Sequence, residues 1–102
     1  MNNNKKNRNI QYFTLTGVVH LISELIHIPR DNAPDLYKKV LTIETSDGQV
    51  LFPEARNHKV RIIEENNIQE KDKVKIEYSF EGSVKNGKKY NNIYLNQIIK
   101  TE

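Results

Sequence analysis

The chain of 102 residues has no cysteine and no tryptophan. Without cysteine it has no disulfide framework and no thiolate metal site, and a reducing compartment suits it, so we expect a cytoplasmic protein. No apolar run approaches the ~20 residues that a membrane-spanning helix needs, and the first residues lack the apolar stretch of a secretory signal. We therefore expect no membrane partner.

Sequence motifs for catalysis and for metal binding are also missing. The three histidines, His20, His27 and His58, do not have the spacing of metal ligands. No serine lies in a nucleophile elbow, and no pair of acidic residues is fixed by local spacing. Residues 82–89 resemble a phosphate-binding P-loop, but Lys89 stands where that motif needs Ser or Thr, and a strand follows instead of a helix. We predict a protein that is not an enzyme and has no cofactor.

The excess positive charge is concentrated at the N-terminus. The formal net charge is +3, and residues 1–10 hold Lys5, Lys6 and Arg8 without any acidic residue, so the remainder is neutral overall. Residues 1–10 also have too few apolar side chains to offset the entropy cost of ordering them. We predict a disordered basic arm over residues 1–10 and one folded domain over residues 11–102.

The last third of the chain predicts a long β-hairpin. Asn86-Gly87 is the sequence that a two-residue type I′ turn prefers, because both of its central residues need a positive φ. Counting outward from this turn gives one face of apolar pairs: Phe80 with Ile93, Tyr78 with Leu95, and Val74 with Ile99. The other face carries polar pairs: Ser83 with Tyr90, Ser79 with Tyr94, and Glu77 with Asn96. One pair, Ile76 with Gln97, fits this register poorly.

Three earlier segments alternate apolar and polar residues and are predicted to be strands: Gln11–Ile28, Tyr37–Ser46 and Gln49–Pro53. A loop over Pro29–Leu36 is predicted between the first and the second strand. The glycine inside the first segment, Gly17, predicts a bend that lets this strand contribute to both halves of a curled sheet. Asp47-Gly48 predicts a second two-residue hairpin. In that register Ile43 faces Phe52 as a core pair, and Pro53 ends the pairing.

One helix is predicted, over Arg56–Asn67. Asn57 is its candidate N-cap, and Asn66 or Asn67 is suited to end it in the left-handed region. The resulting order is three strands, one helix and two strands. This order predicts an all-β protein with one short helix, in which a five-stranded OB-fold barrel has its helix between strands 3 and 4. An SH3-like barrel is the alternative, although that fold rarely has a helix at this point.

Barrels of the OB type bind single-stranded nucleic acids across strands 2 and 3, between the loop after strand 1 and the loop joining strands 4 and 5. Lysines in these regions would neutralise phosphates: Lys38, Lys39, Lys85, Lys88 and Lys89. Tyrosines nearby would offer ring faces on which unpaired bases stack: Tyr37, Tyr90 and Tyr94. We predict these residues as the nucleic-acid-binding site, although tyrosines in strands and lysines at hairpin tips also occur without a ligand.

Several short motifs repeat a known pattern: Leu15–Val19, Tyr37–Lys39, Ile43–Thr45, Glu70–Val74, Asn86–Tyr90 and Ile93. On these motifs the sequence resembles a family of small bacterial OB-fold proteins that are related to single-stranded DNA-binding proteins and are largely uncharacterised conserved proteins. The resemblance implies nucleic-acid binding without catalysis. Members often have tryptophans in strands 3 and 5, in regions where this chain has Ala55, Lys89 and Asn96, and Tyr90 and Tyr94 partly substitute for them.

These features predict a protein that binds single-stranded DNA with little sequence preference, in bacterial or phage-like DNA replication, repair or recombination. RNA is an alternative partner, because nothing in the sequence identifies a contact to a 2′-hydroxyl group. The rival interpretation is a structural or protein-interaction module that uses its sheet edges or its tyrosine face to bind a partner or a second copy of itself as a homo-oligomer. The neutral body and the missing tryptophans favour this rival.

Overall fold

The computed structural model of the chain describes residues 9–101. Its strands are β1 (Phe13–Ile22), β2 (Ile26–Ile28), β3 (Leu36–Thr45), β4 (Val50–Leu51), β5 (Glu54–Arg56), β6 (Lys73–Lys85) and β7 (Lys88–Lys100). A 3₁₀ turn, η2 (Asn57–Lys59), and a helix, α1 (Val60–Glu65), lie between β5 and β6. The predicted basic arm, residues 1–10, lies outside the described residues except for Asn9 and Ile10.

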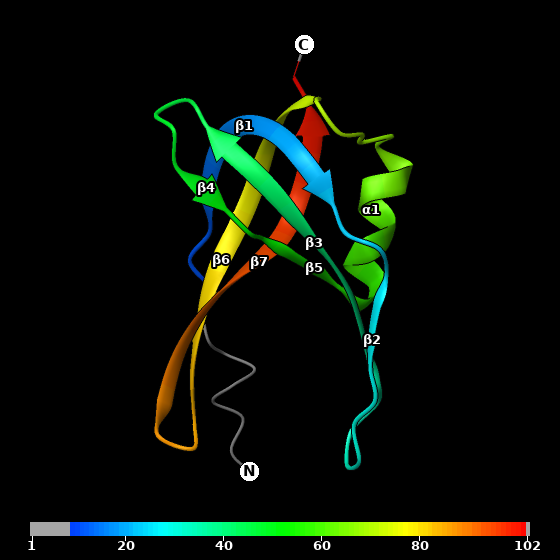
Figure 1. The fold of residues 1–102 in the computed structure, drawn as a ribbon, viewed down its shortest axis with the longest axis vertical. Helices are drawn as coiled ribbons and strands as arrows, with labels where there is room; N and C mark the ends of the chain where they lie inside the picture. The colour runs from blue at the N-terminus through cyan, green and yellow to red at the C-terminus, as the bar shows by residue number, and fades with distance from the viewer. Residues whose placement is uncertain (1–8, 102) are drawn as a thin grey trace.

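The strands close into a barrel (Figure 1). They follow the order β1-β6-β7-β5-β3, and β1 also pairs with β3, which completes the circle. The segments β4 and β5 act as one barrel strand, because both pair with β3 in the same register on either side of Pro53. The barrel therefore has five strands, with β5 and β7 parallel and α1 between the third and fourth strands. This architecture confirms the predicted OB fold.

A bend at Gly17 lets β1 serve both halves of the barrel, as predicted. The first half of β1 pairs with β6 and the second half pairs with β3. A Cβ atom at Gly17 would lie 2.6 Å from the carbonyl oxygen of Glu44, so only glycine allows the two strands to approach this closely. The predicted single strand over Gln11–Ile28 is wrong, since β1 ends at Ile22 and β2 begins at Ile26.

The connection between β3 and β4 differs by one residue from the predicted two-residue turn at Asp47-Gly48. The loop spans residues 46–48, because the N–H of Thr45 donates to the carbonyl of Gln49 at 2.8 Å. Gly48 takes the left-handed conformation, with a φ of 85°. A left-handed glycine at the end of the loop is typical of three-residue hairpins.

This one-residue difference turns Phe52 outward. Ile43 faces Leu51, and Phe52 is 57% exposed instead of forming the predicted core pair with Ile43. A register shift of one residue moves every side chain of a strand to the other face of the sheet. Pro53 does not end the pairing either, because its carbonyl accepts the N–H of Leu41 at 2.9 Å and β5 continues in the same register.

The hairpin of β6 and β7 has the predicted turn at Asn86-Gly87. Both residues have a positive φ, of 52° and 79°. The predicted register holds from the turn as far as Tyr78, which faces Leu95. Beyond that pair a bulge at Asn96 shifts the register by one residue.

The bulge changes three predicted pairs, which become Ile76 with Ile98, Glu77 with Gln97, and Val74 with Lys100. The poor pair of Ile76 with Gln97 is thereby replaced by a pair of fully buried isoleucines. Two residues predicted to face the core do not do so: Phe80 and Ile99 are each about half exposed. The register counted outward from the turn does not include the bulge, because no residue type near Asn96 indicates one.

The helix is shorter than predicted and begins later. Arg56 is the last residue of β5, not the first residue of a helix. Asn57 does not act as the N-cap, because it has a φ of 53° and its side-chain oxygen accepts the N–H of Tyr37 at 3.2 Å. The end of the helix is as predicted: Asn67 has a φ of 55°, and the N–H groups that follow the helix bond back to its carbonyls as in a Schellman motif.

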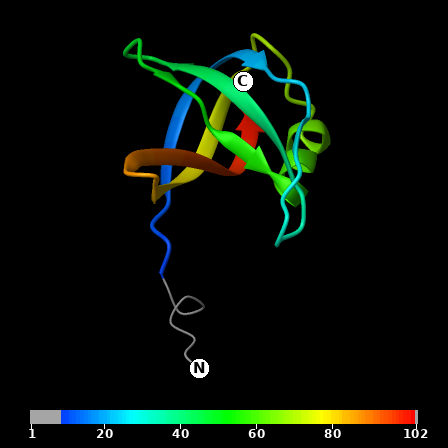
Figure 2. The ribbon, with the colours of Figure 1, turned by 60° about the horizontal axis from the view of Figure 1, so that its bottom comes forward.

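The core fills the barrel with apolar residues from every side: Val19, Leu41, Ile43, Ala55, Ile63, Ile68, Val74, Ile76, Leu95 and Ile98. Helix α1 packs against β3 and β7 and contributes Ile63 to this cluster. Between residues 9 and 101, no helix has the length and apolar character needed to cross a membrane. Two hairpin arms extend from the barrel: the β6–β7 hairpin and the β2–β3 hairpin (Figure 1, Figure 2).

Candidate nucleic-acid interface

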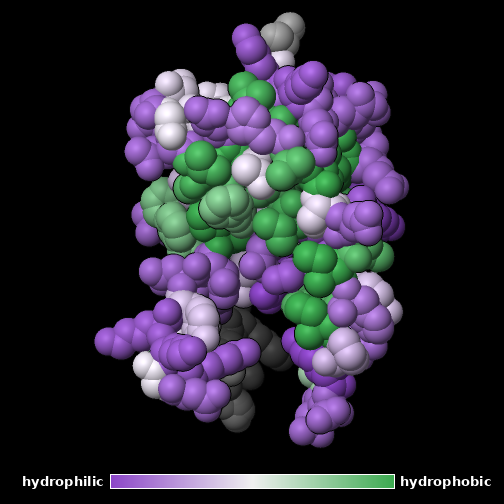
Figure 3. Space-filling view, viewed as in Figure 1, coloured by the Kyte–Doolittle hydropathy of each residue, from purple (hydrophilic) through white to green (hydrophobic). Residues whose placement is uncertain are grey.

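The outward side of β3, β4 and β5 and the adjacent part of β7 form what we call the central face. Its side chains are Lys38, Val40, Phe52, Glu54, Arg56 and Tyr94. They share one side because alternate strand residues point the same way, and the intervening Pro53 and Ala55 are buried. Figure 3 shows apolar side chains gathered over the part of the barrel that β3, β4 and β5 cross in Figure 1, with polar side chains above and below.

A compact charged cluster lies in the middle of the central face. One carboxylate oxygen of Glu54, Oε1, lies 3.3 Å from Lys38 Nζ and 3.0 Å from Arg56 Nε. The guanidinium carbon of Arg56 lies 4.4 Å from the centre of the Tyr94 ring, which is a cation–π contact. Lys38 and Arg56 face each other across β3 and β5, so the carboxylate offsets the repulsion between two opposed cations.

A cleft of about 260 Å³ adjoins this cluster where β5 leads into η2. Its lining includes Tyr12, Arg56, Asn57, His58, Lys59 and Tyr94. Lys59 is held by Asn96, because Lys59 Nζ donates hydrogen bonds to the side-chain oxygen of Asn96 at 2.7 Å and to its backbone carbonyl oxygen at 3.2 Å. The bulge at Asn96 therefore has a consequence at the surface, because it turns the amide toward Lys59 and fixes a cation beside the cleft.

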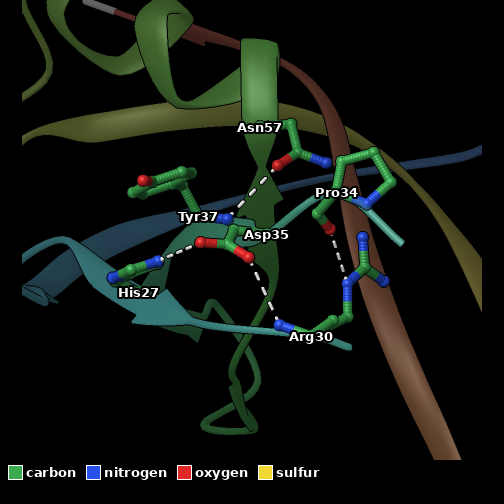
Figure 4. A network of polar contacts seen from close by, with 6 residues as sticks. All are labelled: His27, Arg30, Pro34, Asp35, Tyr37 and Asn57. Carbon is green, nitrogen blue, oxygen red and sulfur yellow. Dashed lines mark hydrogen bonds and ion pairs between the residues drawn. The ribbon is translucent and has the colours of Figure 1, made fainter. Parts of the chain in front are cut away.

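The β2–β3 arm presents a stacked aromatic pair (Figure 4). The rings of His27 and Tyr37 are parallel within 5°, with their centres 4.6 Å apart. Asp35 accepts a hydrogen bond from His27 Nε2 at 2.8 Å and another from the N–H of Arg30 at 3.3 Å. The hydrogen bond from His27 is the main reason that the pKa of Asp35 is lowered, followed by the one from Arg30. Asp35 therefore fixes the His27 ring that stacks on Tyr37, whose side chain is 42% exposed.

The β6–β7 arm carries Lys85, Lys88 and Lys89, which we call the tip lysines. All three are exposed, and Tyr90, opposite Ser83, is 45% exposed. A groove of about 280 Å³ runs between β4 and this arm, and its walls include Phe52 and Ile93. The groove joins the central face to the arm, because Glu54 also lines it.

Of the eight predicted site residues, all except Lys39 fall into three groups. The central face brings Lys38 and Tyr94 together. Tyr37 lies on the β2–β3 arm, and the tip lysines and Tyr90 lie on the β6–β7 arm. Lys39 is next to Lys38 in β3 and points to the opposite side of the strand, where its partner is Ala55.

Phe52, Glu54 and Arg56 lie on the central face but are not among the residues that the sequence predicts for the site. The assumed two-residue turn directed Phe52 inward, and the assumption that Pro53 ends the pairing removed Glu54 and Arg56 from the sheet. The alternation of Phe52, Glu54 and Arg56 across Pro53 is the pattern that would have located them on one face.

Over residues 9–101 no group of three or more His, Asp or Glu side chains is placed to hold a metal ion. The charged groups of the interface are instead paired with each other or directed to solvent. Such an arrangement suits the binding of a charged polymer with aromatic faces.

Comparison with known proteins finds similarity at the level of the fold. No protein-family model and no curated protein sequence matches the chain. The crystal structure of the mitochondrial single-stranded DNA binding protein Rim1 from S. cerevisiae matches with a TM-score of 0.60 and 11% identity, over 90% of this chain and 96% of that one. A second crystal form of Rim1 matches with a TM-score of 0.53 and 14% identity, over 91% and 96% of the two chains.

The dimeric N-terminal domain of PriB from Thermoanaerobacter tencongensis also matches, with a TM-score of 0.50 and 18% identity, over 89% of this chain and 96% of that one. At these identities the similarity shows a shared fold. The chain therefore has the OB fold of the type found in these proteins.

Proposed function

We propose that this chain binds single-stranded DNA with little sequence preference and without catalysis. The observation that carries the proposal is the central face, where the exposed ring of Phe52 and the partly exposed Tyr94, Lys38 and Arg56 lie between two arms that bear further lysines and tyrosines. A single strand offers both phosphates and unpaired base faces, and this surface has groups for each. The fold that the chain shares with Rim1 supports the same conclusion as an analogy.

In this proposal Arg56, Lys38 and the tip lysines contact phosphates. Tyr94, Phe52, Tyr37 and Tyr90 stack on bases, and each such contact contributes about 1–3 kcal/mol. Arg56 lies on the Tyr94 ring, and a guanidinium in that position still has N–H groups at its edge that can bind a phosphate. Ring faces and phosphate contacts do not read base edges, which is why we infer little sequence preference.

Finer assignments stay predictions from the sequence. They are the membership of a small bacterial family, a role in replication, repair or recombination, the cytoplasmic location and the added affinity from the basic arm of residues 1–10. Binding of RNA is the alternative to binding of DNA, because a contact to the 2′-hydroxyl group would make the chain prefer RNA.

The test is a titration of labelled oligo-dT with the protein at two salt concentrations. If five cations (Lys38, Arg56 and the tip lysines) contact phosphates, log K against log salt has a slope near −3.5, at about 0.7 per phosphate on a single strand. A duplex of equal length is the control for simple attraction to a polyanion, and oligo-rU separates RNA from DNA. The absence of salt-sensitive binding to any single strand at low salt would refute the proposal.

A second candidate function, self-association through a sheet edge, is favoured by one observation. Residues 13–16 of β1 pair with β6 on one side, and in the described part of the chain no strand pairs with their other edge. An unpaired strand edge is a template for pairing with another chain. Light scattering with and without oligo-dT distinguishes the two candidates, because a stable assembly that ignores the oligonucleotide favours self-association.

A further inference from the structure

The middle of the central face is occupied by the chain's own carboxylate. Glu54 Oε1 is within 3.3 Å of Lys38 Nζ and within 3.0 Å of Arg56 Nε, and these side chains are 15%, 17% and 32% exposed, respectively. Both cations converge on a single oxygen because they face each other across β3 and β5. Glu54 Oε1 therefore occupies a position between two cationic donors, which is where a phosphate oxygen binds at a nucleic-acid-binding surface.

We propose that Glu54 is an internal competitor of nucleic-acid phosphate, which limits the affinity of the central face by holding Lys38 and Arg56 until a phosphodiester replaces it. This inference rests on the proposed function and identifies the residue that sets its strength. A carboxylate and a phosphodiester both carry one negative charge and accept hydrogen bonds only. Exchanging one for the other therefore conserves the charge-assisted bonds of the two cations and leaves little net gain.

The same carboxylate also positions Arg56. Arg56 is held from the side by Glu54 and lies over the ring of Tyr94. The phosphodiester that displaces Glu54 therefore binds an Arg56 side chain that is already positioned over the ring of Tyr94. Glutamine is the informative replacement, because its side-chain oxygen still accepts a hydrogen bond from Arg56 while the competing charge is removed.

The experiment measures oligo-dT affinity by fluorescence anisotropy at several salt concentrations for the wild-type chain and for Glu54→Gln. The matched control is Glu64→Gln, which makes the same charge change on the exposed part of α1. We expect Glu54→Gln to bind on the order of tenfold more tightly at each salt concentration, because the phosphodiester no longer has to displace a competing charge from Lys38 and Arg56. Glu64→Gln should stay within about twofold of wild type, because the charge of Glu64 is exposed on α1 and is screened by salt.

A second measurement tests whether Glu54 acts through the two cations. The gain from Glu54→Gln should disappear in a background where Lys38 and Arg56 are both methionine, as a double-mutant cycle reports. A Glu54→Gln variant that binds no tighter than wild type would overturn the inference, as would an equal gain from Glu64→Gln or a gain that survives in the methionine background.

The outcomes separate this inference from the function on which it rests. If wild type binds oligo-dT with the expected salt dependence and Glu54→Gln binds no tighter, only the role of Glu54 is refuted. If neither wild type nor Glu54→Gln binds, both are refuted. If wild type binds weakly and Glu54→Gln binds well, both are supported, and the weak affinity of the wild-type chain has its cause in Glu54.

Discussion

Gly17 is the residue on which closure of the barrel depends, and replacing it with alanine tests that dependence. At this point β1 passes from pairing with β6 to pairing with β3. A Cβ atom at Gly17 would lie 2.6 Å from the Glu44 carbonyl oxygen and 2.7 Å from Ile43 Cγ2. The normal separation of such atoms is about 3.5–4.0 Å, so the alanine overlaps its neighbours by roughly 1 Å.

The cost follows from what would have to move. Ile43 is fully buried, and the Glu44 carbonyl belongs to the backbone of β3, so neither atom can yield easily. Overpacking in a well-packed site costs about 1–3 kcal/mol, and contact with fixed backbone favours the upper part of that range. A loss of about 3 kcal/mol lowers the melting temperature of a domain this size by roughly 12–24 °C.

Gly82 provides the matched control, since it is also a strand glycine. A Cβ atom there would come no closer than 3.5 Å to any neighbour outside the adjoining residues, so Gly82→Ala should be neutral or stabilise by about 0.5–1 kcal/mol through reduced freedom of the unfolded chain. The assay is thermal unfolding followed by circular dichroism. Equal melting temperatures for Gly17→Ala and wild type would show that closure of the barrel does not depend on Gly17, as would an equal loss of stability in Gly82→Ala.

Three further predictions concern the interface. Replacing the tip lysines with glutamine should make the slope of log K against log salt shallower by about 2, with an unchanged melting temperature because the tip is exposed; an unchanged slope would remove the tip from the interface. Tyr94→Leu should weaken oligo-dT binding by about 1–3 kcal/mol, or roughly 5- to 150-fold, in the same titration, and an effect under twofold would contradict a stacking role. The NMR titration of the Asp35 carboxyl should have its midpoint below pH 3.8, and His27→Ala should raise this pKa toward 3.8. Because folding lowers the pKa of Asp35, its contribution to stability is present above pH 3.8 and is lost as the pH falls through the pKa of the folded state.

Much of the fold could be predicted because its turn and bend depend on local sequence. Asn86-Gly87 specifies a type I′ turn, and Gly17 marks the bend, since both need a backbone that few other residues allow. The order of strands and helix then leaves the OB barrel as the favoured closed arrangement. Each of these features is decided within a few residues of the chain.

The errors arose where register depends on contacts that are distant in sequence. The bulge at Asn96 is stabilised by pairing Ile76 with Ile98 in the core and by the bonds of Asn96 to Lys59, a residue in η2. The loop after Thr45 has one residue more than the Asp-Gly turn suggests, because this register continues across Pro53 into β5. Neither the bulge nor the length of this loop is determined by the residues of the adjacent turn alone.

The candidate site was predicted in part for the same reason. The sequence places Lys38 and Tyr94 on strands that the structure brings to the central face, whereas the expectation that pairing ends at Pro53 leaves Glu54 and Arg56 out of the sheet. The sequence predicts which residue types are available, but the contact of Arg56 with the Tyr94 ring depends on the parallel pairing of β5 with β7. Such pairings join segments that are far apart along the chain.

The most direct test of the proposed function is the oligo-dT titration of the wild-type chain at low and moderate salt. The proposed function predicts binding to single-stranded DNA that weakens as salt rises, with a slope of log K against log salt near −3.5, and weaker binding to a duplex of the same length. Binding that is absent at low salt, or equal for the single strand and the duplex, would contradict it.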